Sequence, residues 1–330
     1  MNRFKRRSIL IWALFTVLFF SGCKKNGISL NSSSVYLGEN ILVRKVVFTG
    51  STTGYACGGV KGSNGFIFKT SNGGQSWQQI YNSGSNELFD VFFVTDSTGF
   101  ACGDNLTLLK TTTAGARWFS INANPLAYKC PVYPLKGIFF TDTLNGYVAG
   151  GAGFDLGLTL RTVNGGISWL YSTYPRELRD LYFSDAGNGF VCGYGIVMKT
   201  SDGDQSTSVA NVVGDFFTSI CTTPNQTLFV GGYAGGIYRS ADGGATWAKV
   251  YSSGSNFNGV AFDSDLEGFA VGNNGVMVRT EDGGSTWKTV KPFTGYNLYT
   301  VCFLNPGYAG SQQIIVGSDQ GKVYTVSDGN

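Results

Sequence analysis

The stretch Thr70-Ser-Asn-Gly-Gly-Gln-Ser-Trp77 is the first of seven copies of one phrase that recurs through this chain of 330 residues. The other copies begin at Thr111, Thr162, Thr200, Ser240, Thr280 and Val326, and the last is truncated. The eighth positions of the first six copies, which hold Trp except for Thr207, fall 41, 51, 38, 40 and 40 residues apart. A period of about 40 residues in a strand-rich chain is typical of a propeller with one four-stranded sheet per repeat. The sequence therefore predicts an all-β, seven-bladed β-propeller of four-stranded blades.

Each repeat shows the pattern of one antiparallel blade. In the sixth repeat, residues 258–262 and 269–272 are expected to form the first two strands, and a tight hairpin signal at 273–275 precedes a third strand at 276–279. The phrase then turns the chain into a fourth strand. The seventh repeat stops before its fourth strand, so we expect the strand-like residues 33–37 to supply it and close the ring. The propeller is thus assigned to residues 33–330.

The repeated phrase matches the Asp-box, also called the BNR repeat, whose chemistry is local. Its Asp or Asn accepts hydrogen bonds from the backbone of its own turn, its Gly residues adopt dihedral angles that other residues avoid, and its Trp covers the turn. Because the pattern recurs around the ring, we interpret these carboxylates as structural rather than catalytic. The residues assigned to this role are Asn72, Trp77, Trp118, Asn164, Trp169, Asp202, Asp242, Trp247, Asp282, Trp287 and Asp328.

The composition excludes several classes of function. The chain contains no His, which removes the commonest general base and metal ligand, and it contains no Cys-x-x-Cys pair, phosphate-binding loop or metal-ligand motif. We therefore expect no metal and no cofactor. The formal charge of +3 includes four basic residues of a leader, and without them 20 basic residues face 21 acidic ones. A chain so close to neutral has no global field that would attract nucleic acid.

Residues 1–22 are typical of a bacterial lipoprotein signal peptide. A basic start is followed by an apolar stretch of about 12 residues, too short to span a bilayer, which ends in Phe20-Ser21-Gly22-Cys23. Small residues before a Cys resemble a lipobox, so we expect Cys23 to be lipidated and residues 23–32 to form a tether. This lipid anchor would hold the protein in the cell envelope, at the periplasmic side of the outer membrane. The alternative is an ordinary secretory leader that happens to contain a Cys.

Six further cysteines lie in the repeats, and we expect them to be free thiols. Cys57, Cys102 and Cys192 share one repeat position, where other repeats hold Ala or Val, so the site is small, apolar and buried. Equivalent positions in neighbouring blades also lie too far apart for a disulfide, which needs Cα atoms within about 7 Å. Cys221 and Cys302 share a position in the first strand, and Cys130 lies in an insertion.

The repeats carry a family resemblance. Units of the form Arg/Lys-Thr-x-Asp-Gly-Gly-x-Thr-Trp, with Gly-Phe/Tyr-Ala-x-Gly in the second strand, resemble the photosystem II stability/assembly factor family over about residues 33–330. The resemblance implies a non-catalytic assembly factor that holds a partner protein. We carry over the fold and this class of function, but not the photosynthetic partner. The expectation is a monomeric, membrane-anchored scaffold for protein–protein interaction or assembly in the cell envelope.

A basic residue precedes six of the seven boxes, and it allows two interpretations. The residues are Lys69, Lys110, Arg161, Lys199, Arg239 and Arg279, with Thr325 as the exception. They could form a basic ring that grips an acidic partner. Alternatively, each side chain is laid over a neighbouring Trp, with a modest cation–π contribution, and this second interpretation is favoured because the residue travels with the box.

One face of the ring is expected to carry the binding surface. The turns between second and third strands share that face with the links between blades, and irregular loops there cluster around blade three. The interpretation competes with neutral variation of loop length. Arg and Tyr are frequent anchors of interfaces, which favours binding. The candidate contact residues are Tyr128, Lys129, Tyr133, Phe154, Asp155, Tyr174, Arg176 and Arg179.

Two alternatives to a protein-binding scaffold remain open at this point. The first is a carbohydrate-binding propeller, in which Tyr, Trp and Asn contact sugars. The second is a glycoside hydrolase, which needs paired carboxylates; those on the loop-rich face are Asp104, Asp155, Glu177 and Asp319. The arginine triad, nucleophilic Tyr and Arg-Ile-Pro-like motif of sialidases are not found in the sequence. We therefore rank catalysis below binding, and expect the partner to be an envelope protein or a glycan.

Overall fold

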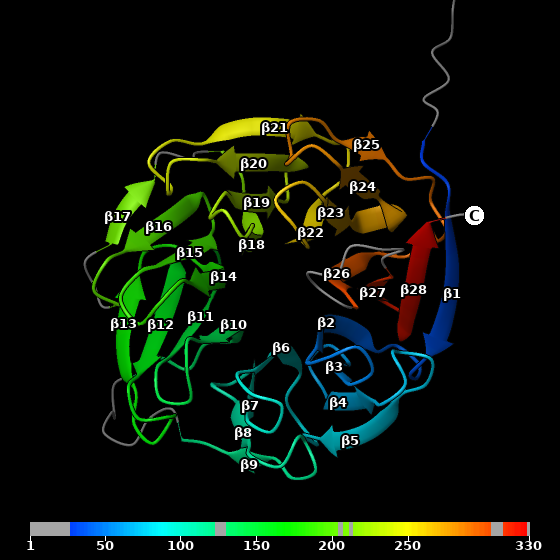
Figure 1. Ribbon diagram of the computed structural model, residues 1–330. Helices are drawn as coiled ribbons and strands as arrows, with labels where there is room; N and C mark the ends of the chain where they lie inside the picture. Colours follow the sequence, from blue (N-terminus) through cyan, green and yellow to red (C-terminus); the bar gives the residue numbers. More distant parts are fainter. Residues whose placement is uncertain (1–26, 123–129, 204–206, 211–213, 305–312, 329–330) are drawn as a thin grey trace, which may run out of the picture.

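The computed structural model describes residues 27–122, 130–203, 207–210, 214–304 and 313–328. Seven four-stranded antiparallel sheets are arranged in a ring, with the first strand of each sheet nearest the centre (Figure 1). The predicted seven-bladed propeller is therefore confirmed. Within the described residues there is no helix long and apolar enough to cross a membrane.

The first four blades follow the chain in order. Blade one comprises β2 (Leu42–Phe48), β3 (Gly54–Gly59), β4 (Gly65–Thr70) and β5 (Gln78–Asn82). Blade two comprises β6 (Leu88–Phe93), β7 (Gly99–Gly103), β8 (Leu108–Thr111) and β9 (Phe119–Ser120). Blade three comprises β10 (Leu135–Phe140), β11 (Gly146–Ala152), β12 (Leu156–Thr162) and β13 (Leu170–Tyr174). Blade four comprises β14 (Leu178–Phe183), β15 (Gly189–Gly193), β16 (Ile196–Thr200) and β17 (Thr207–Ala210).

The remaining blades complete the ring. Blade five comprises β18 (Phe217–Thr222), β19 (Leu228–Gly232), β20 (Gly236–Ser240) and β21 (Ala248–Ser252). Blade six comprises β22 (Phe257–Phe262), β23 (Gly268–Gly272), the 3₁₀ turn η1 (Asn273–Gly275), β24 (Met277–Thr280) and β25 (Lys288–Thr289). Blade seven comprises β26 (Leu298–Phe303), β27 (Ile314–Ser318), β28 (Lys322–Asp328) and β1 (Leu30–Tyr36).

The N-terminal strand closes the ring, as the sequence predicts. β1 pairs antiparallel with β28, from Leu30 opposite Asp328 to Tyr36 opposite Lys322, and the two strands lie side by side at the rim in Figure 1. The strand begins at Leu30, three residues before the predicted start. β1 thus covers the outer edge of β28 and supplies the fourth strand of blade seven, so that the two ends of the chain are held together.

The core consists of apolar layers between neighbouring blades. Second strands such as β3 and β7 are buried at every residue, because they are covered by a blade on each side, whereas the outer strand β5 is exposed or half-buried. Cys57 and Cys102 lie at the expected buried position, and all six described cysteines are free. Burial raises the pKa of both thiols, which keeps them protonated.

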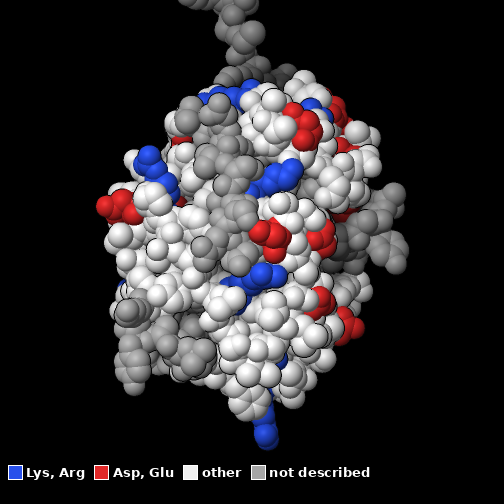
Figure 2. All heavy atoms as spheres, turned by 90° about the vertical axis from the view of Figure 1, so that its left-hand side faces the viewer, with Lys and Arg blue, Asp and Glu red and all other residues white. Residues whose placement is uncertain are grey.

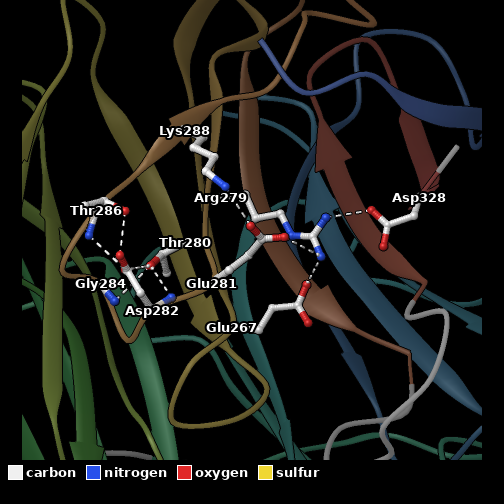
Figure 3. Close-up of polar contacts among 9 residues, drawn as sticks. All are labelled: Glu267, Arg279, Thr280, Glu281, Asp282, Gly284, Thr286, Lys288 and Asp328. Atoms are coloured by element: carbon white, nitrogen blue, oxygen red, sulfur yellow. Dashed lines mark hydrogen bonds and ion pairs between the residues drawn. The ribbon is translucent and has the colours of Figure 1, made fainter. Parts of the chain in front are cut away.

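The Asp-boxes are local turn structures, as expected. In blade six the Asp282 carboxylate accepts hydrogen bonds from the Thr286 backbone N–H at 2.8 Å and from the Thr286 hydroxyl at 2.6 Å (Figure 3). The Thr280 hydroxyl donates to the same carboxylate and accepts from Gly284 N–H, both at 2.9 Å. These hydrogen bonds, led by that of the Thr286 hydroxyl, lower the pKa of Asp282 to about 2. Trp287 packs edge-to-face on Phe262, with ring centroids 5.8 Å apart.

At four of the boxes the preceding basic residue links its blade to the next. Lys69 donates from Nζ to the carbonyl oxygen of Ala114, in the box of the next blade, at 2.9 Å. Its ammonium lies 5.5 Å from the ring centroid of Tyr55, an aromatic residue of the second strand, so the expected packing on a Trp is wrong for this residue. Lys110 of blade two and Lys199 of blade four make the same two contacts: each donates to a carbonyl in the box of the following blade and lies over an aromatic ring of its own second strand.

In blade six the basic residue makes ion pairs in place of the carbonyl contact. Arg279 pairs with Glu267 at 2.7 Å and with Asp328, in the box of blade seven, at 2.6 Å (Figure 3). In blades one, two, four and six, the basic residue before the box therefore contacts the box of the following blade. This contact between successive boxes gives the basic residue a structural role that recurs with the repeat.

The two faces of the ring differ as predicted. The Asp-boxes of blades one, two, three, four and six each donate a backbone N–H to the turn between the first and second strands of their own blade, for example from Gly165 to the Leu144 carbonyl at 2.8 Å. On the opposite face, the links between blades bond the turns between second and third strands. Tyr194 N–H, for example, donates to the Glu177 carbonyl at 2.8 Å. At the edge of the ring shown in Figure 2, acidic and basic side chains are interspersed within a larger uncharged area.

Candidate functional site

The first strand of every blade carries a β-bulge at the same point. The pairing of β2 with β3, for example, shifts between Val43 and Lys45, which leaves Arg44 as the extra residue. The same shift occurs in the other six first strands. We call the seven extra residues the mouth ring, and they are Arg44, Phe89, Lys136, Arg179, Thr218, Asn258 and Tyr299. All seven line one central cavity of about 140 Å³.

The cavity lies at the loop-rich end of the central channel. Each bulge follows the first residue or two of a strand that enters from an inter-blade link, so the mouth ring belongs to the face of the links. Tyr233, in the turn between β19 and β20, also lines the cavity and confirms this placement. A ligand approaching the loop-rich face would therefore meet the mouth ring first.

Two arginines of the mouth ring are held by buried glutamates. Arg44 pairs with Glu87 at 2.7 Å, and Arg179 pairs with Glu177 at 2.8 Å. The glutamate side chains are 2% and 5% exposed, whereas the arginine side chains are 22% and 30% exposed. The two glutamate carboxylates are thus more deeply buried than the guanidinium groups that line the cavity. Lys45, Asp90 and Asp180 line the cavity as well, and Lys45 pairs with Asp90 at 3.7 Å, so cations outnumber carboxylates in its lining. Such buried pairs fix the direction of a guanidinium.

Lys136 differs from both arginines because no described carboxylate lies within ion-pair distance of it. Its Nζ lies 3.4 Å from the ring centroid of Phe89, so the ammonium rests on an aromatic face. Burial, together with the nearby cations of Arg179 and Arg44, lowers the pKa of Lys136 to about 8. An anion bound in the mouth would relieve this repulsion and stabilise the charged form.

In blades two and four the residue after the bulge is an aspartate that fastens its blade to the next. Asp90 accepts hydrogen bonds from its neighbour Val91 N–H at 2.8 Å and from Ile138 N–H of the following blade at 3.0 Å. Asp180 does the same toward Leu181 and Ile220, both at 2.9 Å. Burial raises the pKa of Asp90 to about 6, although Lys45 and the two backbone donors oppose this shift. Both oxygens of each carboxylate are therefore used within the scaffold.

The carboxylates considered for glycoside hydrolysis are distributed over several blades. Asp104 lies in the turn after β7 and Asp319 in the turn after β27. Asp155 is exposed in the turn between β11 and β12. Glu177 lies close to that turn, but its side chain pairs with Arg179 and accepts Phe154 N–H at 3.1 Å. These contacts give Glu177 a positioning role for two of its neighbours.

The predicted contact surface around blade three is only partly assembled. Tyr128 and Lys129 lie outside the described residues. Tyr133 packs against the apolar layer between blades two and three, and Tyr174 packs against the layer between blades three and four. Asp155 is exposed beside Phe154. The structure does bring together the other three residues, Phe154, Arg176 and Arg179, around aromatic rings of blades four and five.

These rings form what we call the aromatic cluster, consisting of Phe154, Tyr194, Phe216 and Tyr233. Phe154 lies 5.1 Å from Tyr194 and 5.7 Å from Phe216, and Tyr233 lies 5.5 Å from Phe216 between ring centroids. Phe154 is 53% exposed, Tyr194 38% and Tyr233 45%, while Phe216 is 9% exposed and forms the base. The guanidinium of Arg176 lies 5.9 Å from the Tyr194 centroid, and that of Arg179 lies 4.7 Å from the Phe216 centroid.

Three members of this cluster were not predicted from the sequence. Tyr194 and Tyr233 both follow the last Gly of a second strand, where blades two, six and seven hold Asp104, Asn273 and Asp319. The sequence signal that could have identified Tyr194 and Tyr233 is the presence of Tyr at a turn position where other repeats hold a polar residue. Phe216 directly precedes the first-strand Phe217 and could not be separated from the core pattern by sequence alone.

Comparison with known proteins supports the fold and the resemblance expected from the repeats. Residues 205–281 match the family model for the photosynthesis system II assembly factor YCF48. The solved structure of YCF48 bound to D1 peptide superposes with a TM-score of 0.71 at 20% identity, over 91% of this chain and 98% of that chain. YCF48 from Cyanidioschyzon merolae gives a TM-score of 0.66 at 18% identity, over 89% and 98%.

The fold is also shared with a propeller of another kind. The WD40 β-propeller domain of Doa1 superposes with a TM-score of 0.69 at 12% identity, over 91% of this chain and 97% of that chain. No curated protein sequence matches the chain. At such identities the structural matches establish a common seven-bladed architecture.

Proposed function

We propose that this protein is a non-catalytic scaffold that binds a partner protein at the loop-rich face of its propeller, with the mouth ring receiving an acidic segment of the partner. The observation that carries this proposal is the arrangement of Arg44, Lys136 and Arg179 around one cavity. Their matched carboxylates are buried beneath two of them, and the third has no described ion-pair partner.

The chemistry of the mouth favours a carboxylate-bearing segment. Guanidinium groups bind carboxylates in a fixed planar geometry, and a lysine with a depressed pKa gains a favourable interaction when an anion arrives. Phe89 lies between Arg44 and Lys136, at 5.4 and 3.4 Å from its ring centroid, and Tyr299 lies 4.9 Å from Arg44, so both rings provide apolar contact beside the cations. A peptide with Asp or Glu side chains offers both kinds of group, which a free inorganic anion does not.

The comparisons support the same class of function. A structural neighbour with the same seven-bladed fold was solved bound to a D1 peptide, which illustrates a propeller of this shape holding a segment of another protein. The family model that matches residues 205–281 describes an assembly factor. For this chain we propose a role in holding or assembling a protein of the cell envelope, as a monomer, with Cys23 as the site of a lipid anchor.

The test begins by identifying the partner, through crosslinking and affinity capture from native envelopes. Binding of that partner is then compared between the wild type, Lys136→Met, and a matched control, Lys61→Met. Lys61 is exposed in the turn between β3 and β4, on the same face but outside the cavity. We expect Lys136→Met to weaken binding at least about tenfold, since charge-assisted contacts contribute about 1.5–3 kcal/mol. The control should bind like the wild type.

Two further measurements distinguish specific binding at the mouth ring from nonspecific binding. Binding should weaken with added salt, because exposed charges are screened. It should also strengthen as the pH falls from 9 to 7, because Lys136 becomes charged through its pKa of about 8. Equal affinity of the wild type and Lys136→Met would contradict the proposed role of the mouth.

A further inference from the structure

The aromatic cluster exposes apolar rings at a place where the repeats otherwise hold polar turns. Tyr194 and Tyr233 occupy the repeat position of Asp104, Asn273 and Asp319, so neither is needed to build a blade. Two successive blades nevertheless present Tyr at this position, and blade three adds the exposed ring of Phe154. A contiguous group of exposed aromatic residues on a monomeric domain is a mark of a binding surface.

Phe154 is held in an unusual backbone conformation. Its φ is +72°, in the left-handed region that favours Gly and that a bulky side chain rarely adopts. Both of its backbone groups are bonded to Glu177: Phe154 N–H donates to the carboxylate at 3.1 Å, and Glu177 N–H donates to the Phe154 carbonyl at 2.9 Å. A buried glutamate thus fixes an aromatic side chain at a strained position, although a Gly there would be free of strain.

The cluster continues directly into the mouth. Arg179 belongs to the mouth ring, and its guanidinium also lies 4.7 Å from the Phe216 ring centroid. Tyr233 lines the same cavity and lies 5.5 Å from Phe216. Glu177 contacts both Arg179 and Phe154, so one buried carboxylate positions a cation of the mouth and a ring of the cluster.

We propose that the aromatic cluster is a second subsite of the same surface, which takes an apolar side chain of the partner segment while an acidic residue of that segment enters the mouth. This inference rests on the proposed function. It adds a requirement on the ligand: an apolar residue close to an acidic one, in an extended segment that crosses from the channel over blades four and five.

The ring geometry favours an apolar side chain over a sugar. Sugars stack on a flat, exposed aromatic platform. Within the cluster only Phe216 and Tyr233 are nearly parallel, with planes 27° apart, and Phe216 is buried, whereas the Tyr194 and Phe154 planes meet that of Phe216 at 85° and 78°. Rings that pack edge-to-face in this way expose faces and edges in different directions, and an apolar side chain can contact these without needing one flat platform. Arg176, which makes no ion pair within the described residues, adds a cation at the outer edge of the cluster and suits an acidic neighbour.

Short random peptides displayed on phage test this requirement even before the partner protein has been identified. They are selected in parallel on the purified wild-type protein and on Tyr194→Asn/Tyr233→Asn, which introduces residues that equivalent turns of this chain use. Tyr296→Asn is the matched control, because Tyr296 is 40% exposed in an inter-blade link and lies outside the cluster. We expect wild-type peptides to combine an acidic residue with an apolar one. The double variant should bind the best of these peptides at least about tenfold more weakly, while the control binds like the wild type.

The outcomes distinguish this inference from the function on which it rests. Acidic peptides without an apolar preference, or equal binding by Tyr194→Asn/Tyr233→Asn and the wild type, would overturn the second subsite and leave the mouth intact. Selected peptides that lack acidic residues and bind equally well to Lys136→Met would overturn both. If the wild type binds oligosaccharides on a glycan array and the double variant does not, the aromatic cluster is a glycan site and not a peptide subsite. Near-wild-type thermal unfolding of the double variant is the control for folding.

Discussion

Replacing Lys136 by Met should make the protein more stable at neutral pH, although it removes a charged group from a candidate binding site. Lys136 is half-buried, lies between two arginines of the mouth ring, and has no described carboxylate in ion-pair contact. Its charge is therefore disfavoured in the folded state. Met has nearly the same length and needs no solvation, so the substitution keeps the packing of the aliphatic stem.

The magnitude follows from two opposing contributions. A fall in the pKa of Lys136 from 10.5 to about 8 corresponds to about 3 kcal/mol if it is fully expressed in stability. Solvent screening at this half-buried side chain reduces that contribution to about 2 kcal/mol. The cation–π contact of Nζ with the Phe89 ring, at 3.4 Å from its centroid, stabilises the folded wild type by about 1 kcal/mol. The burial contribution prevails, and the expected net gain for Lys136→Met is about 1 kcal/mol.

The gain should depend on pH in one direction. Below pH 8 the lysine is charged in both the folded and the unfolded chain, so the wild type carries the whole penalty. Between pH 8 and 10.5 the folded chain loses this proton first, and the stability contributed by the group rises. The advantage of Lys136→Met should consequently be largest at pH 7 and become smaller toward pH 10.

Denaturant unfolding at pH 7 and pH 10 measures both effects, with Lys61→Met as the control for loss of an exposed charge. The free-energy difference between Lys136→Met and the wild type is the relevant quantity, because other titrations cancel in it. A variant less stable than the wild type at pH 7, or a gain that does not shrink with rising pH, would refute the reasoning about repulsion in the mouth.

Three other predictions concern the scaffold and its anchor. Arg44→Met should destabilise the protein by about 3 kcal/mol, because it leaves the buried Glu87 without its partner. Equal stability of this variant and the wild type in the same denaturant assay would contradict the prediction. All six propeller cysteines should react with a thiol reagent in denaturant without reductant, and Cys57 and Cys102 should not react in the folded protein; a count of four or fewer in denaturant would reveal a disulfide. Cys23→Ala should move the protein from the membrane to the soluble fraction after a salt wash, and continued sedimentation with membranes would disprove anchoring by that residue.

The opposite signs expected for Lys136→Met and Arg44→Met come from one structural difference. Both residues are the extra residue of a bulge and line the same cavity. Arg44 has a glutamate beneath it that is 2% exposed, whereas Lys136 has an aromatic ring. A positive charge over a buried carboxylate is required by the fold, while a positive charge over a ring among other cations is a cost that function can explain.

The sequence by itself determined the number of blades, the position of each Asp-box, the closure of the ring by an N-terminal strand and the division into two faces. These features are encoded locally and repeated: a turn phrase such as Thr280 to Trp287 forms its own hydrogen bonds, and its period sets the sheet size. The shared site of Cys57 and Cys102 was also readable, because comparison of repeats within one chain shows which positions tolerate only small apolar residues.

Only the tertiary structure decided which residues meet at the mouth and in the aromatic cluster. Arg44, Lys136 and Arg179 come from blades one, three and four, and each sits at a bulge that the strand pattern does not reveal, since an extra residue leaves the apolar alternation readable on either side. The sequence names Tyr133 and Tyr174 as candidate contact residues together with Phe154, yet both pack against the layers between blades. Whether an aromatic ring points into an inter-blade layer or toward solvent depends on the curvature of the ring and on the neighbouring blade, which no single repeat specifies.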